Sequence, residues 1–455
     1  MSAIRLGSAH RFAVVAAAFA ATIGTVESAR GQMGFGNQAV GGISVDARGI
    51  VANLDPRAVE SLAAERRKAL EAGEWTGTAG DSRKVSLKAI VAAVGEAAAT
   101  NKPLPAEVTY LGGLQRIDHV FVDPDGHDVV LVGPADSLAV DAAGNVVGAS
   151  TGRPPLLLED LIVALRATEQ ARSGGVTCSI DPSPEGLRRL QGLLANQGAV
   201  RGDPQALFAA MEEAVGPQRV TLAGVPADSR FARVLVAADY RMKRIGMGHE
   251  PSGLKTLPSY LALVPGGGKT NALPRFWLEA DYDPIARDAD ELAWKIGGRR
   301  MKCLTESDAL AGDGVKRGGG AADPTARKWC AAMTANYDAL SRKHPVFADL
   351  ANCIDLAVVA TLIRGNQLDA RAGCDLSVLL DGSAVPLARY EVPETVATVA
   401  TGVRKGSAWV VTASGGISFQ PWEISAHTAE SAESAPLRTA AIAARPTALA
   451  GCSWD

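Results

Sequence analysis

The sequence predicts a layered protein of the α+β or α/β class, built from several chain segments that combine sheets and helices. Three observations predict this class. Short alternating apolar stretches, typical of strands, recur along the chain, and amphipathic helical stretches lie between them. Two of these helical stretches, near residues 324–364, follow one another and are expected to pack as a helical hairpin. The third observation is residues 218–248, where a strand pattern leads directly into a long helix.

The first residues have the pattern of a secretory signal peptide. Arg5 and Arg11 precede an apolar, alanine-rich run from Phe12 to Val26, which is short for a bilayer span of about 20 residues. We expect residues 1–28 to be the signal peptide, with an uncleaved anchor as the alternative, and residues 29–42 to be a flexible lead-in. No later run looks apolar enough to cross a membrane. The mature chain is therefore expected to be exported, periplasmic or secreted, without a transmembrane segment.

Composition and turn residues divide the rest of the chain into six parts. The last part is mostly Ala, Ser, Thr and Glu and lacks an apolar periodicity, which is typical of a mobile segment. The expected parts are an N-terminal α+β region (43–172), an α/β region (173–250), an extended aromatic and acidic region (251–311), a glycine-rich linker (312–323), the helical hairpin with strands (324–424) and a mobile tail (425–455).

The N-terminal α+β region reads as strands that alternate with helices. Short strands flank turns at residues 46–49 and 141–144, and a hairpin turns at residues 123–126. Helical patterns cover residues 56–71 and 87–99. A further helix follows Pro154 and Pro155, and we expect its leucines to form one buried face.

The α/β region reads as strand, two helices, strand and helix. Ser183-Pro184 and Asp203-Pro204 each supply a capping residue followed by proline at the first helical position. The last helix is expected to be capped by Asp228, with apolar residues on one side and arginines on the other. This order predicts a small layered unit whose strand direction stays open.

The C-terminal half contains the helical hairpin and two further strand stretches. Asp323-Pro324 and Pro345 are the expected helix starts, and strand patterns return at residues 375–380 and 409–419. The sequence GGISF at residues 415–419 resembles GGISV at residues 41–45, so we expect both ends of the chain to contribute to one sheet.

Composition excludes some classes of function. Lys and Arg number 46 against 49 Asp and Glu, giving a net charge of -3, and no long block of basic residues is present. Nucleic acid is therefore not an expected partner. The six cysteines contain no C-x-x-C pair, which disfavours a zinc site or a thioredoxin-like site, and their disulfide pairing does not follow from the sequence.

Three short motifs resemble catalytic or nucleotide-binding signatures but lack the context that the chemistry needs. Gly148–Gly152 fits a nucleophile elbow around Ser150, yet prolines follow where a helix should start. Gly266–Thr270 resembles the end of a phosphate-binding loop but lacks its first glycine. Ser252 and Lys255 fit S-x-x-K within a segment rich in glycine and proline. We expect none of the three to be catalytic.

One cluster of carboxylates is a candidate site. Glu279, Asp281 and Asp283 alternate, so an extended segment would project them to one side, and Asp288 follows closely. Outside the cytoplasm, calcium is the cation expected to neutralise such a cluster, which makes Asp281, Asp283 and Asp288 candidate ligands. A solvated acidic loop is the plain alternative. A catalytic alternative is a glycosidase in which Glu279 and Asp281 form the carboxylate pair and Trp277 stacks on a sugar.

Four stretches together resemble a family of exported bacterial proteins catalogued as domain of unknown function 1598. They are LVGPADSLAVDAAGNVVGASTGRPPLLLEDLIVALR (131–166), TCSIDPSPEGLRRLQ (177–191), GVPADSRFARVLVAADYRMKRIGMG (224–248) and NCIDLAVVATLI (352–363). The resemblance extends over about residues 40 to 420. It implies kinship but no activity, cofactor or catalytic residue.

The function expected from the sequence is a non-catalytic envelope or secreted protein that binds another macromolecule or a surface. This expectation rests on the lack of a catalytic constellation. Two alternatives stay open: a hydrolase of an extracellular polymer that uses carboxylates near Asp281, and a calcium-dependent assembly protein that uses the same cluster.

Overall fold

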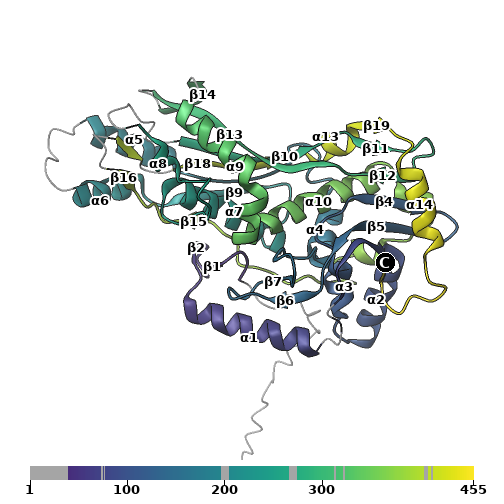
Figure 1. The fold of residues 1–455 in the computed structure, drawn as a ribbon. Coiled ribbons are helices and arrows are strands. Elements are labelled where there is room, and N and C mark those ends of the chain that lie inside the picture. The colour runs from purple at the N-terminus through teal and green to yellow at the C-terminus, as the bar shows by residue number, and fades with distance from the viewer. Residues whose placement is uncertain are drawn as a thin grey trace, which may run out of the picture.

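Two large mixed sheets and a layer of central helices make up the fold (Figure 1). The computed structural model describes residues 39–72, 75, 77–195, 204–265, 274–311, 314–320, 323–403, 408–410 and 413–455. The layered α+β class predicted from the sequence is confirmed. The expected signal peptide and most of the expected lead-in lie outside the described residues.

The first sheet joins segments from both ends of the chain and from its middle, as expected. Most neighbouring strands are antiparallel, but β2 pairs with β15 and β10 pairs with β18 in parallel. Within the described residues its order is β1 (Ile43–Val45), β2 (Ile50–Asn53), β15 (Thr395–Val396), β9 (Gln218–Ala223), β8 (Val176–Asp181), β18 (Ser414–Phe419), β10 (Pro274–Tyr282), β13 (Gly298–Ala311) and β14 (Gly314–Gly320).

The second sheet is centred on the hairpin of β4 and β5, whose turn was predicted. Its order within the described residues is β19 (Thr428–Glu430), β11 (Ile285–Arg287), β12 (Ala293–Lys295), β4 (His119–Asp123), β5 (Asp128–Ala135), β3 (Gly80–Ser86) and β20 (Ser453–Trp454). Two small ribbons accompany the sheets, β6 (Leu138–Val140) with β7 (Val146–Gly148) and β16 (Thr401–Val403) with β17 (Ala408–Val410).

The helices include the expected hairpin, formed by α9 and α10. The helices of the described residues are α1 (Pro56–Ala72), α2 (Leu87–Thr100), α3 (Ala106–Thr109), the 3₁₀ turn η1 (Leu111–Gly113), α4 (Leu158–Ala167), α5 (Pro184–Ala195), α6 (Pro204–Val215), α7 (Arg230–Met247), α8 (Tyr260–Leu263), α9 (Pro324–Lys343), α10 (Val346–Gly365), α11 (Leu368–Ala372), α12 (Ser377–Leu380), α13 (Pro421–Ala426) and α14 (Ser434–Ala443).

Helix α10 is the centre of the core. Every residue from Val346 to Ile363 is buried, and the helix packs against α4, α7, α9 and α13. Its length and composition would suffice for a bilayer span, so the expectation that no such run follows the N-terminal segment was wrong on composition. In the fold this apolar surface is covered by protein on all sides, as in a core helix.

The predicted order of strand, two helices, strand and helix in residues 173–250 is confirmed as β8, α5, α6, β9 and α7, with β8 and β9 antiparallel. Two details of α7 differ from the prediction. Ser229, not Asp228, caps the helix by accepting a hydrogen bond from the Ala232 amide. The expected polar face is also largely enclosed, because Arg233 is only 1% exposed. The periodicity of the helix could not reveal the burial of this face, because the segments that cover it are distant in sequence.

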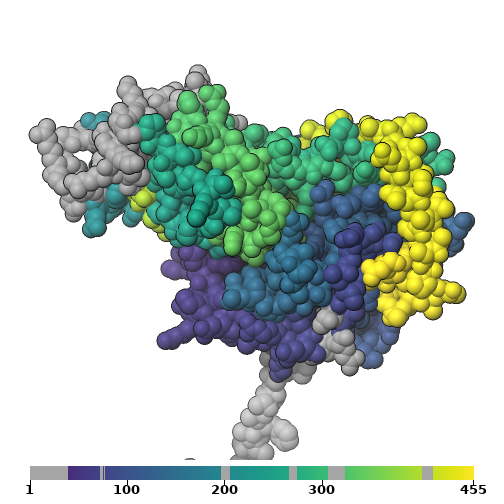
Figure 2. Space-filling model, viewed as in Figure 1, coloured from purple at the N-terminus to yellow at the C-terminus, as the bar shows by residue number. Residues whose placement is uncertain are grey.

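The expected linker and mobile tail are both corrected by the structure. Residues 314–320 pair with β13 as strand β14. The C-terminal segment forms α13, β19, α14 and β20 and lies along the second sheet, in yellow in Figure 2. Cys452 is fully buried and Trp454 is 7% exposed. The composition of the tail is misleading because its order comes from pairing with strands far away in the chain.

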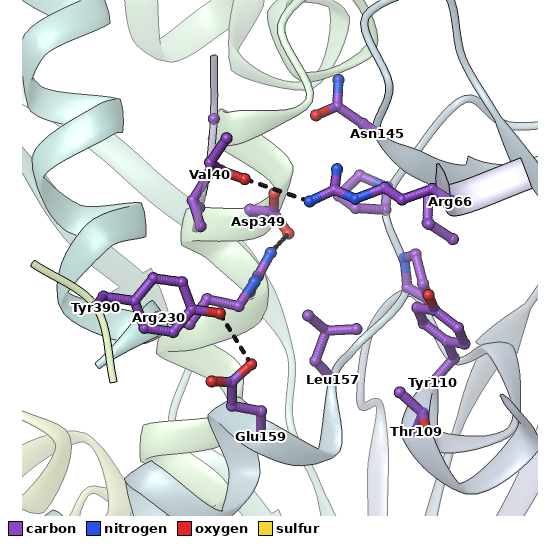
Figure 3. A pocket seen from close by; sticks show the side chains of 15 residues that line it. Val40, Arg66, Thr109, Tyr110, Asn145, Leu157, Glu159, Arg230, Asp349 and Tyr390 are labelled. Carbon is purple, nitrogen blue, oxygen red and sulfur yellow. Dashed lines mark hydrogen bonds and ion pairs between the residues drawn. The ribbon is translucent and has the colours of Figure 1, made fainter. Parts of the chain in front are cut away.

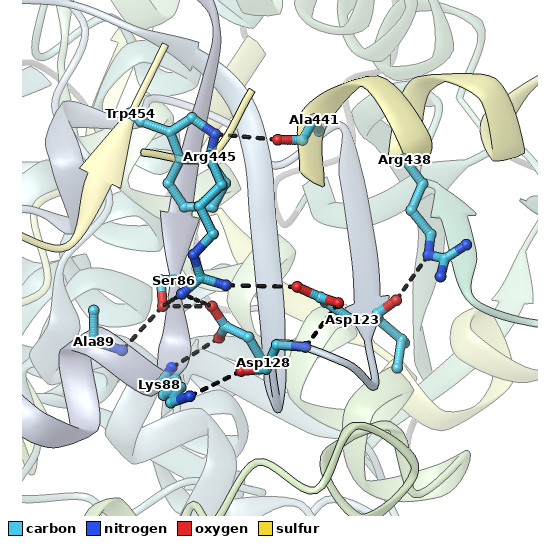
Figure 4. A network of polar contacts seen from close by, with 11 residues as sticks. Ser86, Lys88, Ala89, Asp123, Asp128, Arg438, Ala441, Arg445 and Trp454 are labelled. Carbon is cyan, nitrogen blue, oxygen red and sulfur yellow. Dashed lines mark hydrogen bonds and ion pairs between the residues drawn. The ribbon is translucent and has the colours of Figure 1, made fainter. Parts of the chain in front are cut away.

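A polar network fastens this C-terminal segment to the second sheet (Figure 4). Arg445 contacts the carboxylate of Asp128 at 2.9 Å and that of Asp123 at 3.6 Å. Asp128 also accepts hydrogen bonds from the Ser86 hydroxyl at 2.5 Å and from the Lys88 amide at 2.9 Å. Charged partners that are largely enclosed hold the segment in one place.

The last residue of the chain gives a direct test of this docking. Asp455 accepts two hydrogen bonds from Arg83, at 2.6 and 3.0 Å, and Arg83 is only 3% exposed. We expect Asp455→Asn to lower the free energy of unfolding by about 1 kcal/mol, because the guanidinium loses its ionic partner. Urea unfolding measures this, with Asp375→Asn on the exposed surface as the control. Equal stability of the two variants would contradict a docked C-terminus.

Candidate functional site

Three helices begin at the same place in the core, and charged side chains from their first turns meet there (Figure 3). Glu159 and Asp160 come from α4, Arg230 is the first residue of α7, and Asp349 comes from the first turn of α10. Each helix start carries the positive end of a helix dipole. The junction therefore favours negative charge.

The local sequence explains why these helices start where they do. Pro154 and Pro155 keep the chain extended before α4, and Pro345 directly precedes α10. Neither α4 nor α10 has a side-chain cap, so their first amides face the junction without one.

Arg230 joins two of the carboxylates in a buried ion triad. Its guanidinium forms an ion pair with Asp160 and a second one with Asp349 at 3.1 Å. Burial alone would lower the pKa of Arg230, but attraction to the two carboxylates outweighs it and raises that pKa. Burial also raises the pKa of Asp160, to about 6, which leaves the group ionised at neutral pH beside Arg230. The triad is thus charged and fixes three helix starts together.

Glu159 differs from its neighbours because no cation forms an ion pair with it among the residues that the structure describes. The residue is 3% exposed, and the Tyr390 hydroxyl donates a hydrogen bond to Oε2 at 3.4 Å. Its Oε1 is buried and has no hydrogen-bond partner among the described residues. Burial, reinforced by the charge of Asp160, raises the pKa of Glu159 to about 8. At neutral pH this side chain is therefore mostly a neutral acid that can donate a hydrogen bond.

Glu159 lines a small cavity, which we call the Glu159 pocket, with a volume of about 100 Å³. Polar donors and apolar surface share its wall. The lining residues are Ala39, Val40, Gly41, Arg66, Thr109, Tyr110, Asn145, Val146, Pro154, Pro155, Leu157, Glu159, Arg230, Asp349 and Tyr390. Space of this size holds a few water molecules or one small ligand.

Arg66 is the second cation of the pocket, and its partners are neutral. Its guanidinium donates to the carbonyl oxygens of Gly144 at 2.6 Å and Ala39 at 3.3 Å. Burial, together with repulsion from Arg230, lowers its pKa but leaves an arginine charged at neutral pH. The Tyr110 phenol also lines the pocket, and burial raises its pKa, so it stays a neutral hydroxyl.

The charges of the pocket and its triad can be counted. Arg66 and Arg230 balance Asp160 and Asp349, while Glu159 is neutral. The three helix starts add positive partial charge, roughly half an elementary charge each. From the helix dipoles we expect a positive potential in the pocket, and with its hydrogen-bond donors and protonated acid this suits a small anionic ligand.

The structure places the three predicted calcium ligands in different surroundings. Asp281, at the end of β10, lies 3.8 Å from both Arg299 and Lys302. Asp288 is 4% exposed and accepts hydrogen bonds from the amides of Leu292 and Ala293. Asp283 is exposed, and its amide donates to Gly297.

No group of three or more His, Cys, Asp or Glu side chains suited to a metal ion occurs in the part of the chain that the structure describes. The calcium assignment and the hydrolase alternative stay predictions. Neither Asp281, Glu279 nor Trp277 lines the Glu159 pocket.

The other sequence motifs have structural roles where the structure describes them. Ser150 donates its hydroxyl hydrogen bond to Asp136 at 2.8 Å, and no helix starts behind it. The Ser252 hydroxyl donates to the carbonyl of Leu257 at 2.5 Å. Gly266–Thr270 lies outside the described residues. All six cysteines are free and buried.

The residues of the pocket were missed at the sequence level. One signal was available: Glu159 and Asp160 are adjacent acids inside the apolar run of residues 156–165, which the structure buries except for the half-buried Leu157. Charged residues in such a run must find partners or change their protonation state. Arg230 gave no such signal, because an arginine beside an amphipathic helix usually faces water.

The fold and the pocket define a layered α+β protein with a polar, positively polarised cavity in its core. Residues 178–260 of this chain match the family described as Protein of unknown function (DUF1598). This segment spans β8 to the start of α8 and contributes Arg230 to the pocket. The resemblance predicted from the sequence is confirmed there. No curated protein and no solved structure matches the chain.

Proposed function

We propose that this protein is a non-catalytic binding protein that holds a small carboxylate or other oxyanion in the Glu159 pocket. The observation that carries the proposal is the buried acid Glu159, which belongs to the pocket lining and whose Oε1 has no hydrogen-bond partner among the described residues. An unpaired polar atom at this depth is unfavourable unless water or a ligand satisfies it. The bound anion would accept hydrogen bonds from Glu159, Tyr110 and Arg66.

The proposal includes two expectations from the sequence: the protein is exported, and it binds a macromolecular partner. An exported binding protein would meet its ligand outside the cytoplasm. The proposal for the pocket does not depend on the compartment, since it rests on side chains of the folded chain.

Thermal unfolding of the full chain with acetate, succinate, phosphate and sulfate tests the proposal. A ligand that binds only the folded state, at 100 times its dissociation constant, adds about 2.7 kcal/mol to stability. We expect at least one of these anions to raise the melting temperature of the wild type. Arg66→Gln should abolish the rise, whereas Arg67→Gln, its exposed neighbour on α1, should keep it.

The same binding should depend on pH through Glu159. Its pKa of about 8 means that it donates a hydrogen bond below this pH and carries a repelling charge above it. Affinity for the anion should therefore fall as the pH rises through about 8. Equal effects of every anion on the wild type and on Arg66→Gln would contradict the proposal.

A further inference from the structure

A second concave surface lies between β13, α9 and α10, apart from the Glu159 pocket. We call it the basic groove, and its cavity volume is about 670 Å³. Its wall carries five cations and one carboxylate. The lining residues are Gln115, Arg116, Arg153, Arg299, Arg300, Lys302, Cys303, Leu304, Ala331, Thr334, Ala335, Tyr337, Asp338, Ser341, Ala348 and Ala351.

A bulge in β13 supplies an unusual density of these cations. Asp281 pairs with Arg300 and Tyr282 with Gly298, so Arg299 is an extra residue without a partner in the register. Regular alternation would turn Arg299 away from Arg300 and Lys302. Instead, all three line the groove. Arg300 has a φ of 74°, a strained conformation for a residue with a side chain, and such strain is concentrated at functional sites.

Carboxylates pair with three of the cations, and one of these carboxylates, Asp355, is buried. Arg300 forms a two-pronged ion pair with Asp355 of α10, at 2.7 and 3.0 Å. Arg116 contacts Asp118 at 2.7 Å, and Arg153 is paired with Asp338. These contacts orient the guanidinium groups and give the groove a fixed wall.

Arg299 and Lys302 are less completely neutralised. They share one carboxylate, Asp281, and both contacts measure 3.8 Å, which exceeds the length of a direct hydrogen bond. The Arg299 side chain is 61% exposed and that of Lys302 is 35% exposed. Glu279 lies opposite Lys302 in the strand register and adds negative charge beside it. We therefore expect Arg299 to bind an anion more strongly than Lys302 does.

The groove also has an apolar side. Leu304 is 40% exposed, which is unusual for a large apolar side chain in this structure. Ala331 and Ala335, one turn apart on α9, are exposed and line the same groove. An apolar wall beside fixed guanidinium groups suits a ligand with an apolar body and an anionic head.

We propose that the basic groove is a binding site for an amphiphilic organic anion, with its carboxylate, sulfonate or phosphate on Arg299 and Lys302 and its apolar body on Leu304. The ligand is too large for the Glu159 pocket, whose volume is about 100 Å³. The two sites can therefore be tested separately.

Fluorescence titration of the full chain with anilinonaphthalene sulfonate, which carries one sulfonate on an aromatic body, tests this site. We expect saturable binding to the wild type. Arg299→Gln with Lys302→Gln should weaken it about tenfold, because two charge-assisted contacts are lost. Leu304→Ser should weaken it as well. Among the described residues Arg299 forms an ion pair with Asp281 alone, and its side chain is 61% exposed, so we expect its replacement to leave the fold intact.

The matched control is Arg188→Gln with Lys68→Gln, two exposed cations on α5 and α1 outside the groove. It removes the same charge and should leave the affinity unchanged. Equal weakening in this control would mean that net charge alone attracts the probe, and the proposal would be overturned. Unchanged affinity of the Leu304→Ser variant would overturn the proposed contact between Leu304 and the apolar body of the ligand. The groove would then bind only the anionic group.

Discussion

Arg230→Met is expected to destabilise the protein by about 3–5 kcal/mol, the range for removing one partner of a buried ion cluster. Asp160 is 2% exposed and Asp349 is 7% exposed, and both would lose their shared cation. Helix dipoles at α4 and α10 soften the loss but cannot replace a guanidinium at contact distance. Chemical unfolding measures the change as a shift of the transition midpoint.

Two further variants separate this cause from general damage. Arg188→Met, on the exposed face of α5, removes a pair with Glu185 and should change stability by less than about 1 kcal/mol. Adding Asp160→Asn to Arg230→Met removes one stranded charge and should recover part of the loss. If Arg230→Met were no worse than Arg188→Met, the triad would not be a stabilising feature of the junction.

Local sequence signals predicted the parts of the fold that local signals control. Ser183-Pro184 and Asp323-Pro324 start α5 and α9 as expected, because a cap followed by proline fixes a helix start without help from elsewhere. The order of β8, α5, α6, β9 and α7 was correct for the same reason.

The errors over the C-terminal tail and the polar face of α7 share one physical origin, which is pairing and packing between distant segments. β19 gains its order from β11 and β20 from β3, and neither short strand has an apolar pattern of its own. Burial of Arg233 and of the Asp239–Lys243 pair on α7 likewise depends on elements that pack there from elsewhere in the chain.

The candidate site could not be predicted because it is assembled from segments that are distant in sequence. Its polar groups come from α1, α4, α7, α10 and the segment around Tyr390, and no two of these elements are adjacent in the sequence. The carboxylates that alternate near Asp281 were easier to notice, yet alternation reports only a shared face of a strand. Depth in the core, which sets the protonation of Glu159, follows from the assembled fold alone.

Glu159→Gln is expected to make the protein more stable than the wild type at alkaline pH. The pKa of Glu159 is about 8 in the folded protein, raised by burial, against about 4.3 in an unfolded chain. The folded state therefore holds the proton more tightly. The stability associated with this group is fully present below about pH 4 and is lost as the pH rises through about 8.

The size of the effect follows from the difference between the two pKa values. Each unit of pKa corresponds to about 1.4 kcal/mol, so complete ionisation of Glu159 costs roughly 5 kcal/mol, of which roughly 4 kcal/mol is lost between pH 5 and pH 9. Glutamine keeps the shape and the hydrogen bond from Tyr390 but never ionises. The stability difference between Glu159→Gln and the wild type should thus grow by roughly this amount between pH 5 and pH 9.

Urea unfolding at several pH values measures this difference, and the comparison cancels the titration of groups that do not interact with Glu159. Asp160 and Asp239, which are also buried with raised pKa values, are present in both proteins. The exposed Glu169→Gln variant is the matched control and should follow the wild type at every pH. A constant difference for Glu159→Gln from pH 5 to pH 9 would mean that Glu159 is already ionised at neutral pH. The pocket would then lack its neutral acid, and the anion proposed to bind there would meet a repelling charge.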